Sequence, residues 1–189
     1  MIRWALRRLL HAPSRRCTDS VRYKVLFVCM GNLCRSPTAE AVFRRQVDLA
    51  GLTARIACDS AGTHDLNLGK APDGRARAAA RRRGYEVLRR RRRQVKQEDF
   101  ATFDLILAMD RQNLEGLRER CPPEYSARLR LLMEFAHRHT DLDVPDPYYG
   151  NAQGFELVLD MIEDACEELL RHVQTTHLSG AELAGGSRG

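Results

Sequence analysis

Short apolar segments alternate along this 189-residue chain with longer segments whose apolar residues recur at helical spacing. The candidate strands are 25–29 (VLFVC), 55–60, 85–88, 105–109 (LILAM) and 128–133. The candidate helices are 37–50, 73–83, 111–120 and 155–173. Strands that are separated by helices predict an α/β protein with a parallel sheet and helices on both of its faces. Ligands of such proteins bind at the carboxyl ends of the strands.

The composition is that of a single globular domain. Hydrophobic residues make up 43% of the chain, but no apolar run reaches the roughly 20 residues of a membrane helix. The six cysteines are too few for a disulfide framework, and none of them forms a Cys-x-x-Cys pair of the kind that binds zinc. We therefore expect a cytoplasmic protein without a membrane span, a metal or another cofactor.

Charge is segregated along the chain, whose formal net charge is +6. Residues 75–96 are strongly basic, whereas residues 97–189 are strongly acidic. The arginine runs 81–83 and 89–93 could bind nucleic acid or an acidic partner, but no aromatic residues that would stack on bases are interleaved with them. We expect these runs to form a solvated face turned toward the acidic C-terminal half, and we expect no nucleic-acid partner.

The two ends of the chain differ from its middle. Residues 1–20 are basic and weakly amphipathic, as in an organelle-targeting or membrane-surface helix. Because short amphipathic matches are common by chance, we favour a basic extension that is disordered or dispensable. Residues 174–189 are small and polar, which predicts a flexible tail. The folded domain is then expected at 24–173.

The segment 29–37 (CMGNLCRSP) carries the chemistry of the chain. Cys29 ends the first predicted strand, and Gly31 and Asn32 tolerate the positive φ that turns the N–H groups of a loop inward. The helix that follows directs its positive N-terminal end to the same point, and Arg35 carries a planar pair of donors for phosphate oxygens. A cysteine surrounded by such groups has a lowered pKa and ionises to a thiolate. A thiolate that faces a bound phosphate predicts nucleophilic attack on phosphorus.

This loop resembles the phosphate-binding loop of low-molecular-weight protein tyrosine phosphatases. Further motifs of that family follow in order, namely AEAVFR, DSAGT, APDGRA, RQVKQEDFATFDLILAMDRQNL and VPDPYYGN. The resemblance covers residues 24–173 and implies a flavodoxin-like, doubly wound three-layer sandwich. It also implies a four-stranded parallel sheet with the phosphate loop after the first strand. The activity it implies is hydrolysis of phosphotyrosine through a phosphocysteine intermediate, without a cofactor.

The resemblance implies catalytic roles for three residues. Cys29 is expected to be the nucleophile, Arg35 to clamp the phosphoryl oxygens, and Asp146 to protonate the leaving phenolate and then activate water. Taken alone, the Asp146-Pro147 pair would be an ordinary turn. Its combination with the loop favours the catalytic interpretation.

The resemblance also implies supporting roles. Ser36 is expected to hydrogen-bond the Cys29 sulfur, and Ser60 is expected to hydrogen-bond Asn32, which keeps the loop curled. Cys34 is expected to trap an oxidised nucleophile as a disulfide. The other residues expected to contact phosphate or substrate are Met30, Gly31, Leu33, Tyr148 and Tyr149.

Two leucines bear on the expected substrate. Leu66 stands where members of this family usually present an aromatic residue to the substrate ring, and it can pack on that ring without an aromatic quadrupole. Leu33 stands where the branch that resembles protein-arginine phosphatases has a threonine, so that branch is disfavoured. The expected partners are phosphotyrosine-containing proteins, among them a bacterial tyrosine autokinase, and we expect a monomer or a weak dimer.

Two other functions are alternatives. An arsenate reductase would resemble the same fold and loop, but it needs a further close cysteine pair, and Cys58, Cys121 and Cys166 are far apart in the sequence. A non-catalytic module for phosphorylated partners would be expected to lack Cys29 or Asp146, and both are present. The sequence therefore favours the phosphatase.

Overall fold

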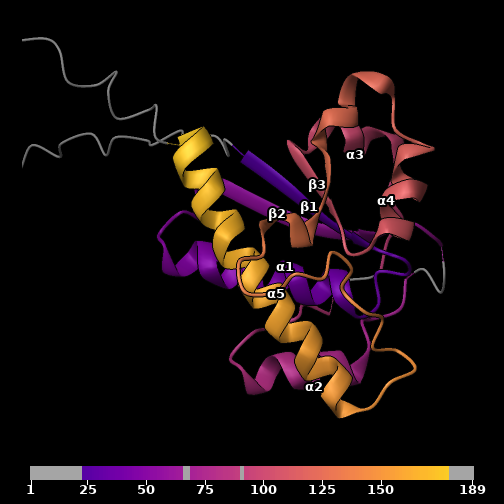
Figure 1. Cartoon of the computed structure of the whole chain (residues 1–189), viewed down its shortest axis with the longest axis vertical. Coiled ribbons are helices and arrows are strands. Elements are labelled where there is room, and N and C mark those ends of the chain that lie inside the picture. The colour runs from indigo at the N-terminus through magenta and orange to yellow at the C-terminus, as the bar shows by residue number, and fades with distance from the viewer. Residues whose placement is uncertain (1–22, 66–68, 90–91, 179–189) are drawn as a thin grey trace, which may run out of the picture.

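The structure, a computed structural model, describes residues 23–65, 69–89 and 92–178 (Figure 1). At its centre is a parallel sheet of four strands in the order β2, β1, β3, β4. The strands are β1 Tyr23–Cys29, β2 Ile56–Gly62, β3 Leu105–Ala108 and β4 Leu129–Leu131. The predicted fold class is therefore confirmed.

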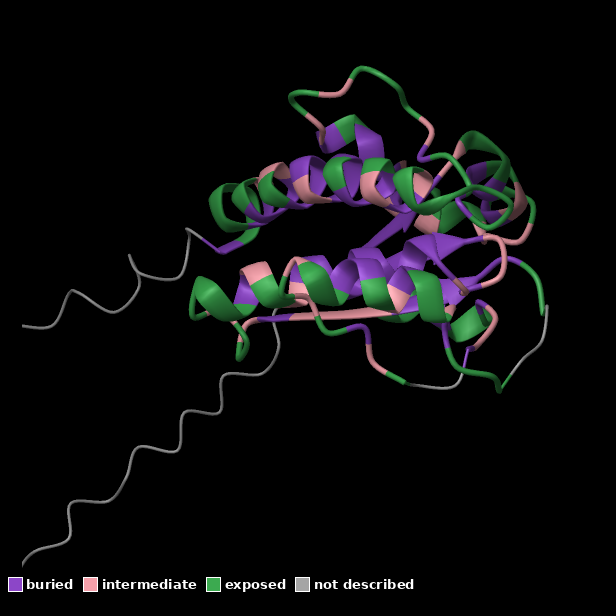
Figure 2. Cartoon of the chain, turned by 90° about the horizontal axis from the view of Figure 1, so that it is seen from below, coloured by how far each residue is buried: buried purple, intermediate pink, exposed green. Residues whose placement is uncertain are grey.

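Helices cover both faces of this sheet, as Figures 1 and 2 show. The helices are α1 Arg35–Leu49, α2 Gly74–Arg82, α3 Gln97–Thr102, α4 Arg111–Arg118 and α5 Ala152–Val173, with short turns η1 Pro123–Arg128, η2 Leu132–Phe135 and η3 Gln174–Leu178. In β1, Val25 and Phe27 pack in the core under α1, α2 and α5, whereas Leu26 and Val28 pack in the core under α3 and α4. Burial on both faces explains why this strand is an uninterrupted apolar run.

The strand order places the loop after β1 at the functional edge of the sheet. β1 lies between β2 and β3. The chain leaves the carboxyl end of β1 through α1 on one face of the sheet, and it leaves the carboxyl end of the neighbouring β3 through α4 on the other face. Loops at such a switch point separate from each other and leave room for a ligand. The segment between Cys29 and Arg35 therefore lies where an α/β sheet binds its ligands.

The structure corrects the limits of two helices and of the folded domain. α1 begins at Arg35 and not at 37, so Arg35 belongs to its first turn. α5 begins at Ala152, three residues before the expected start, and continues into the turn η3. Leu178 in this turn is buried, so the folded part extends into the expected tail. The extension at 1–20 and the rest of the tail lie outside the described residues.

The strand expected at 85–88 is wrong. These residues form no strand, since the Tyr85 N–H donates back to the last turn of α2 and the Val87 side chain is buried in the helix-side core. Further along the described chain, Gln94 forms an isolated bridge with Gly62 of β2. Val87 thus belongs to the loop after α2 and packs its side chain into the core.

The expected contact between the basic and acidic parts is confirmed for one arginine run. Arg83 pairs with Glu156 (2.7 Å), Asp160 (2.7 Å) and Glu163 (3.0 Å) on α5, and Arg82 also pairs with Glu156 (2.7 Å). The second run lies partly outside the described residues. Within the described part of the chain, no helix is both long and apolar enough to cross a membrane.

Candidate active site

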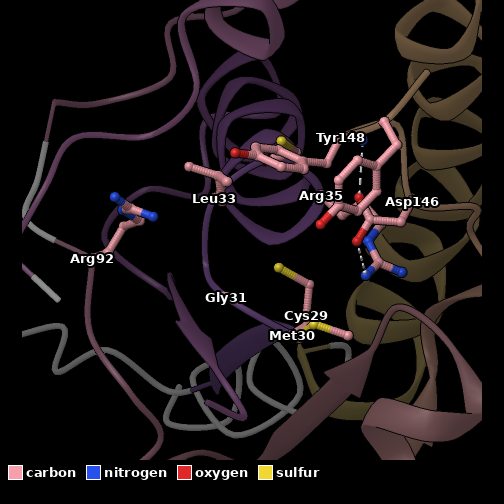
Figure 3. Close-up of a pocket in the computed structure, with 10 residues that line it drawn as sticks. Cys29, Met30, Gly31, Leu33, Arg35, Arg92, Asp146 and Tyr148 are labelled. Carbon is pink, nitrogen blue, oxygen red and sulfur yellow. Dashed lines mark hydrogen bonds and ion pairs between the residues drawn. The ribbon is translucent and has the colours of Figure 1, made fainter. Parts of the chain in front are cut away.

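A cavity of about 230 Å³ lies at the carboxyl end of β1 (Figure 3). Its walls come from the loop after β1, from a segment before α5 and from one arginine between β2 and α3. The lining residues are Cys29, Met30, Gly31, Leu33, Cys34, Arg35, Arg92, Asp146, Tyr148 and Tyr149. The fold thus brings together the two motifs that the sequence singled out, although 111 residues separate Arg35 from Asp146.

Asn32 determines the curl of the loop. It is buried and adopts a φ of 50°, in the left-handed region that asparagine tolerates. Gly31, which was expected to share this role, does not have a positive φ. The Asn32 amide donates to the hydroxyls of Ser36 and Ser60, both at 3.0 Å. These bonds tie the loop to α1 on one side and to β2 on the other.

A buried carboxylate supports Ser60 from behind. The Ser60 hydroxyl donates to Glu40 Oε2 at 2.7 Å, which leaves its lone pairs to accept from Asn32. Glu40 is itself paired with Arg44 at 3.1 Å on the next turn of α1. Glu40 was not expected from the sequence, although an acidic residue among the apolar positions of a helix was a usable signal. Asn32 thus has a fixed orientation.

Cys29 is buried at the base of the cavity. Its Sγ lies 3.1 Å from the Ser36 hydroxyl, and either atom can donate in this contact. Ser36 also has the Ala61 carbonyl within donating distance, at 3.1 Å. When Cys29 is a thiolate, it can only accept, so the hydroxyl hydrogen of Ser36 is then directed to the sulfur.

Cys34 lies in the same loop but in a different electrostatic setting. Burial raises the pKa of its thiol, and the negative charges of Asp73, Cys29 and Asp146 raise it further. Cys34 is therefore a neutral thiol at physiological pH. Cys29 and Cys34 are both free cysteines in the structure.

Arg35 connects the loop with two carboxylates. Its Nη2 lies 2.9 Å from Asp146 Oδ2, and its Nη1 bonds Asp110 and the Val144 carbonyl, the latter at 3.1 Å. Burial opposes the charge of Arg35, but the negative charges of Cys29, Asp146 and Asp110 outweigh it and raise the pKa. Asp110 was not expected from the sequence, although an acidic residue that closely follows β3 lies at the same edge of the sheet as the loop.

Two tyrosines form the wall opposite the loop. Tyr148 is 41% exposed and Tyr149 94%, and their rings meet edge to face with centroids 4.9 Å apart. Arg75 of α2 donates to the Tyr148 carbonyl (2.9 Å) and lies 5.4 Å from the centre of its ring. The Tyr148 backbone is thus fixed, while the Tyr149 ring is free to meet a partner.

Residues 24–178 match the profile of the family described as "Low molecular weight phosphotyrosine protein phosphatase". The chain belongs to this family. It is 46% identical over 155 residues to a low molecular weight protein-tyrosine-phosphatase of Streptomyces coelicolor, covering 80% of this chain and 94% of that one. It is 39% identical over 157 residues to the low molecular weight phosphotyrosine protein phosphatase of Sus scrofa, covering 82% and 99%.

Solved structures agree with this assignment. A crystal structure of a protein tyrosine phosphatase from Entamoeba histolytica, with Hepes in its active site, matches with a TM-score of 0.79 and 42% identity. The match covers 81% of this chain and 97% of that chain. The protein is therefore a phosphatase, as the resemblance implied.

In this phosphatase, the expected site residues fall into three groups. Nine of them line the cavity, as given above. Asn32, Ser36 and Ser60 do not line the cavity; the Asn32 amide donates to both serines, and Ser36 contacts the Cys29 sulfur. Leu66 lies outside the described residues. Arg92 lines the cavity and was not expected there.

Proposed function

We propose that this phosphatase hydrolyses phosphotyrosine in proteins through a phosphocysteine intermediate on Cys29. The observation that carries the proposal is the convergence of Cys29, Arg35 and Asp146 on one cavity. A nucleophile, an anion-binding guanidinium and a carboxyl group are the three parts that a two-step phosphoryl transfer needs. The curled loop supplies inward N–H groups beside them.

In the first step, the Cys29 thiolate attacks phosphorus and the bond from phosphorus to the tyrosine oxygen breaks. Asp146 transfers its proton to that oxygen, so tyrosine leaves as a neutral phenol. In the second step, the Asp146 carboxylate takes a proton from water, and the oxygen of that water attacks phosphorus. The S–P bond breaks, and the Cys29 thiolate and inorganic phosphate are formed. Ser36 stabilises the thiolate each time it appears.

Arg35 stabilises the charge on the phosphoryl oxygens in both steps. Its two terminal nitrogens now bond Asp146 and Asp110, and phosphoryl oxygens need the same donors. Binding of the substrate phosphoryl group therefore weakens the hold of Arg35 on Asp146.

The proposed substrates are proteins, because Tyr148 and Tyr149 at the mouth of the cavity are exposed and can contact a large partner. A bacterial tyrosine autokinase, which carries phosphotyrosine on its own chain, is one such partner. We place the activity in the cytoplasm, where the thiols of Cys29 and Cys34 stay reduced. The segment 1–20 has no part in the proposed chemistry.

The test compares the wild-type protein and Cys29→Ser on peptides that carry phosphotyrosine, phosphoserine or phosphoarginine. We expect the wild type to release phosphate from the phosphotyrosyl peptide, and a rapid acid quench to leave phosphate on the Cys29 peptide. We expect Cys29→Ser to lose turnover, because a hydroxyl is far less acidic than a thiol. Turnover that persists in the variant, or a preference for another phosphoamino acid, contradicts the proposal. Thioredoxin-coupled arsenate turnover by the wild type would support the reductase instead.

A further inference from the structure

Arg92 is a cationic residue of the cavity wall that the proposed reaction does not use. It is 7% exposed and lines the same cavity as Cys29. In Figure 3 it lies across the cavity from Arg35 and Asp146, on the side of Gly31. It comes from the segment that leads to α3 and does not belong to the phosphate loop.

The backbone of Arg92 is fixed against a neighbouring segment. Its N–H donates to the Lys70 carbonyl (3.1 Å), and its own carbonyl accepts from the Gly69 N–H (3.2 Å). The side-chain Nε also donates to the Lys70 carbonyl, at 3.2 Å. These three bonds hold the base of the side chain and leave the two terminal nitrogens available for another group.

The charge of Arg92 has no counter-ion among the residues that the structure describes. The adjacent Arg93 differs in this respect, since it pairs with Asp59 (2.9 Å) and Asp99 (2.7 Å). A guanidinium that is almost fully buried and has no anionic partner raises the free energy of the folded protein. An anion brought by the substrate would remove this cost, and the side chain is already directed along the cavity wall.

The phosphoryl group itself is not the best candidate for this anion. In the proposed reaction, the N–H groups of the loop between Cys29 and Arg35 and the Arg35 guanidinium already bind that group. Arg92 lies beyond Gly31, on the outer side of this loop (Figure 3). From there it can meet a second anionic group on the residues that flank the phosphotyrosine.

We propose that Arg92 forms a second anion subsite, which binds a carboxylate or a second phosphoryl group next to the phosphotyrosine of the substrate. The proposal rests on the proposed function and adds a substrate class to it, namely acidic phosphotyrosyl segments. Both sources offer the same chemistry, paired anionic oxygens that match the planar donors of a guanidinium.

The test uses one peptide backbone with phosphotyrosine and three versions of the neighbouring residue: Glu, its neutral analogue Gln, or a second phosphotyrosine. The readout is the ratio of kcat/KM for each anionic version to kcat/KM for the Gln version, measured within one enzyme. We expect a wild-type ratio of roughly tenfold for at least one anionic version, which corresponds to one desolvated charge-assisted pair. The ratio should decrease as salt increases.

Arg92→Gln should bring the ratio close to one, and Arg92→Lys should keep part of it, because lysine retains the charge without the planar fork. A loss of activity from a disturbed loop changes both peptides equally and cancels in the ratio. Arg81→Gln is the matched control, since it removes the same charge from an exposed position on α2. Its ratio should equal that of the wild type.

The outcomes separate this inference from the proposed function. A wild-type ratio near one, or a ratio that Arg92→Gln leaves intact, overturns the second subsite while phosphotyrosine hydrolysis stands. A preference for the second phosphotyrosine alone identifies a phosphoryl group as the source of the anion. If no peptide is hydrolysed, the proposed function fails. Affinities of the three peptides for Cys29→Ser, measured by calorimetry, then decide the subsite by the same ratio.

Discussion

The guanidinium of Arg35 holds the carboxylate of Asp146, with 2.9 Å between Nη2 and Oδ2. A second contact comes from the Tyr148 N–H, which donates to Asp146 Oδ1 at 3.1 Å. The proposed phosphoryl clamp and the proposed general acid therefore position each other. Because Asp146 is partly exposed and Arg35 is buried, the arginine provides the fixed reference.

The first prediction concerns Asp146 as a proton donor. In Asp146→Ala, we expect kcat to fall by roughly 10²–10⁴-fold for aryl phosphates with poor leaving groups. The loss should be much smaller for p-nitrophenyl phosphate, because its phenolate leaves without a proton. The measurement is kcat across a series of phenols of increasing pKa, for the variant and the wild type. Equal losses along the whole series would show that Asp146 acts only through structure.

The part of the site that the sequence predicted is the part encoded locally. Cys29 and Arg35 flank one short loop, so strand, turn and helix signals sufficed to place them together. Asp146 was recognised only through the resemblance, because its contact with Arg35 spans 111 residues. Asp110 was signalled only by its place after a predicted strand, and Arg92 lies in a segment between α2 and α3 without a motif. Whether either residue reaches the cavity depends on contacts between segments that are distant in the sequence.

The same limit explains the errors in the predicted elements. Val87 was assigned to a strand because a short apolar pattern does not reveal whether a sheet edge is within reach. The helix α3 at 97–102 was missed because it is only six residues long. Its signal was the acidic first turn, where the Asp99 side chain accepts from the Lys96 N–H at 2.8 Å.

The second prediction separates two roles of Asp110. Its Oδ1 accepts from the Asn113 N–H (2.6 Å) and caps α4, while its Oδ2 bonds Arg35. Asp110→Asn keeps a good cap but loses the ion pair, and Asp110→Ala loses both. We expect kcat to fall by a similar factor in both variants, roughly three- to tenfold. Both variants should lose stability because the buried Arg35 loses an anionic partner, and Asp110→Ala should lose about 1 kcal/mol more in urea unfolding because it also loses the cap. Unequal activities would contradict the positioning role.

The third prediction concerns the two thiols of the loop. Peroxide should inactivate the wild type reversibly, because the oxidised sulfur of Cys29 can condense with the Cys34 thiol to form a disulfide and release water. Cys34→Ala should not recover activity with dithiothreitol after the same treatment. Activity before and after the reductant is the readout, with peptide mapping of the disulfide. Cys121→Ala, which removes a thiol outside the cavity, should recover like the wild type. Full recovery of Cys34→Ala would exclude this pair.

The fourth prediction rests on a buried carboxylate far from the cavity. Asp164 on α5 accepts from the backbone N–H groups of Arg138 (2.9 Å) and His139 (3.1 Å). It also accepts from Arg138 Nε (3.1 Å) and His139 Nδ1 (3.0 Å). Burial alone would raise its pKa, but the bonds from His139 and Arg138 outweigh burial and hold the pKa of Asp164 well below its ordinary value. The carboxylate thus fastens the loop before the cavity segment to the last helix.

Asp164→Asn should lower the free energy of unfolding by about 3 kcal/mol at pH 7. The amide NH2 group of asparagine would face the N–H donors of Arg138 and His139 in a buried site. A carboxylate with a lowered folded-state pKa stabilises fully above its unfolded pKa of about 4, and this contribution is lost as pH falls toward the folded-state pKa. The difference in unfolding free energy between wild type and variant should therefore be constant from pH 7 to about 5 and narrow below about 4. Urea unfolding at stepped pH measures it, with Glu167→Gln on the exposed side of α5 as the control. A gap that stays constant down to pH values near 3 would mean that the charge of Asp164 contributes nothing and that only its shape matters.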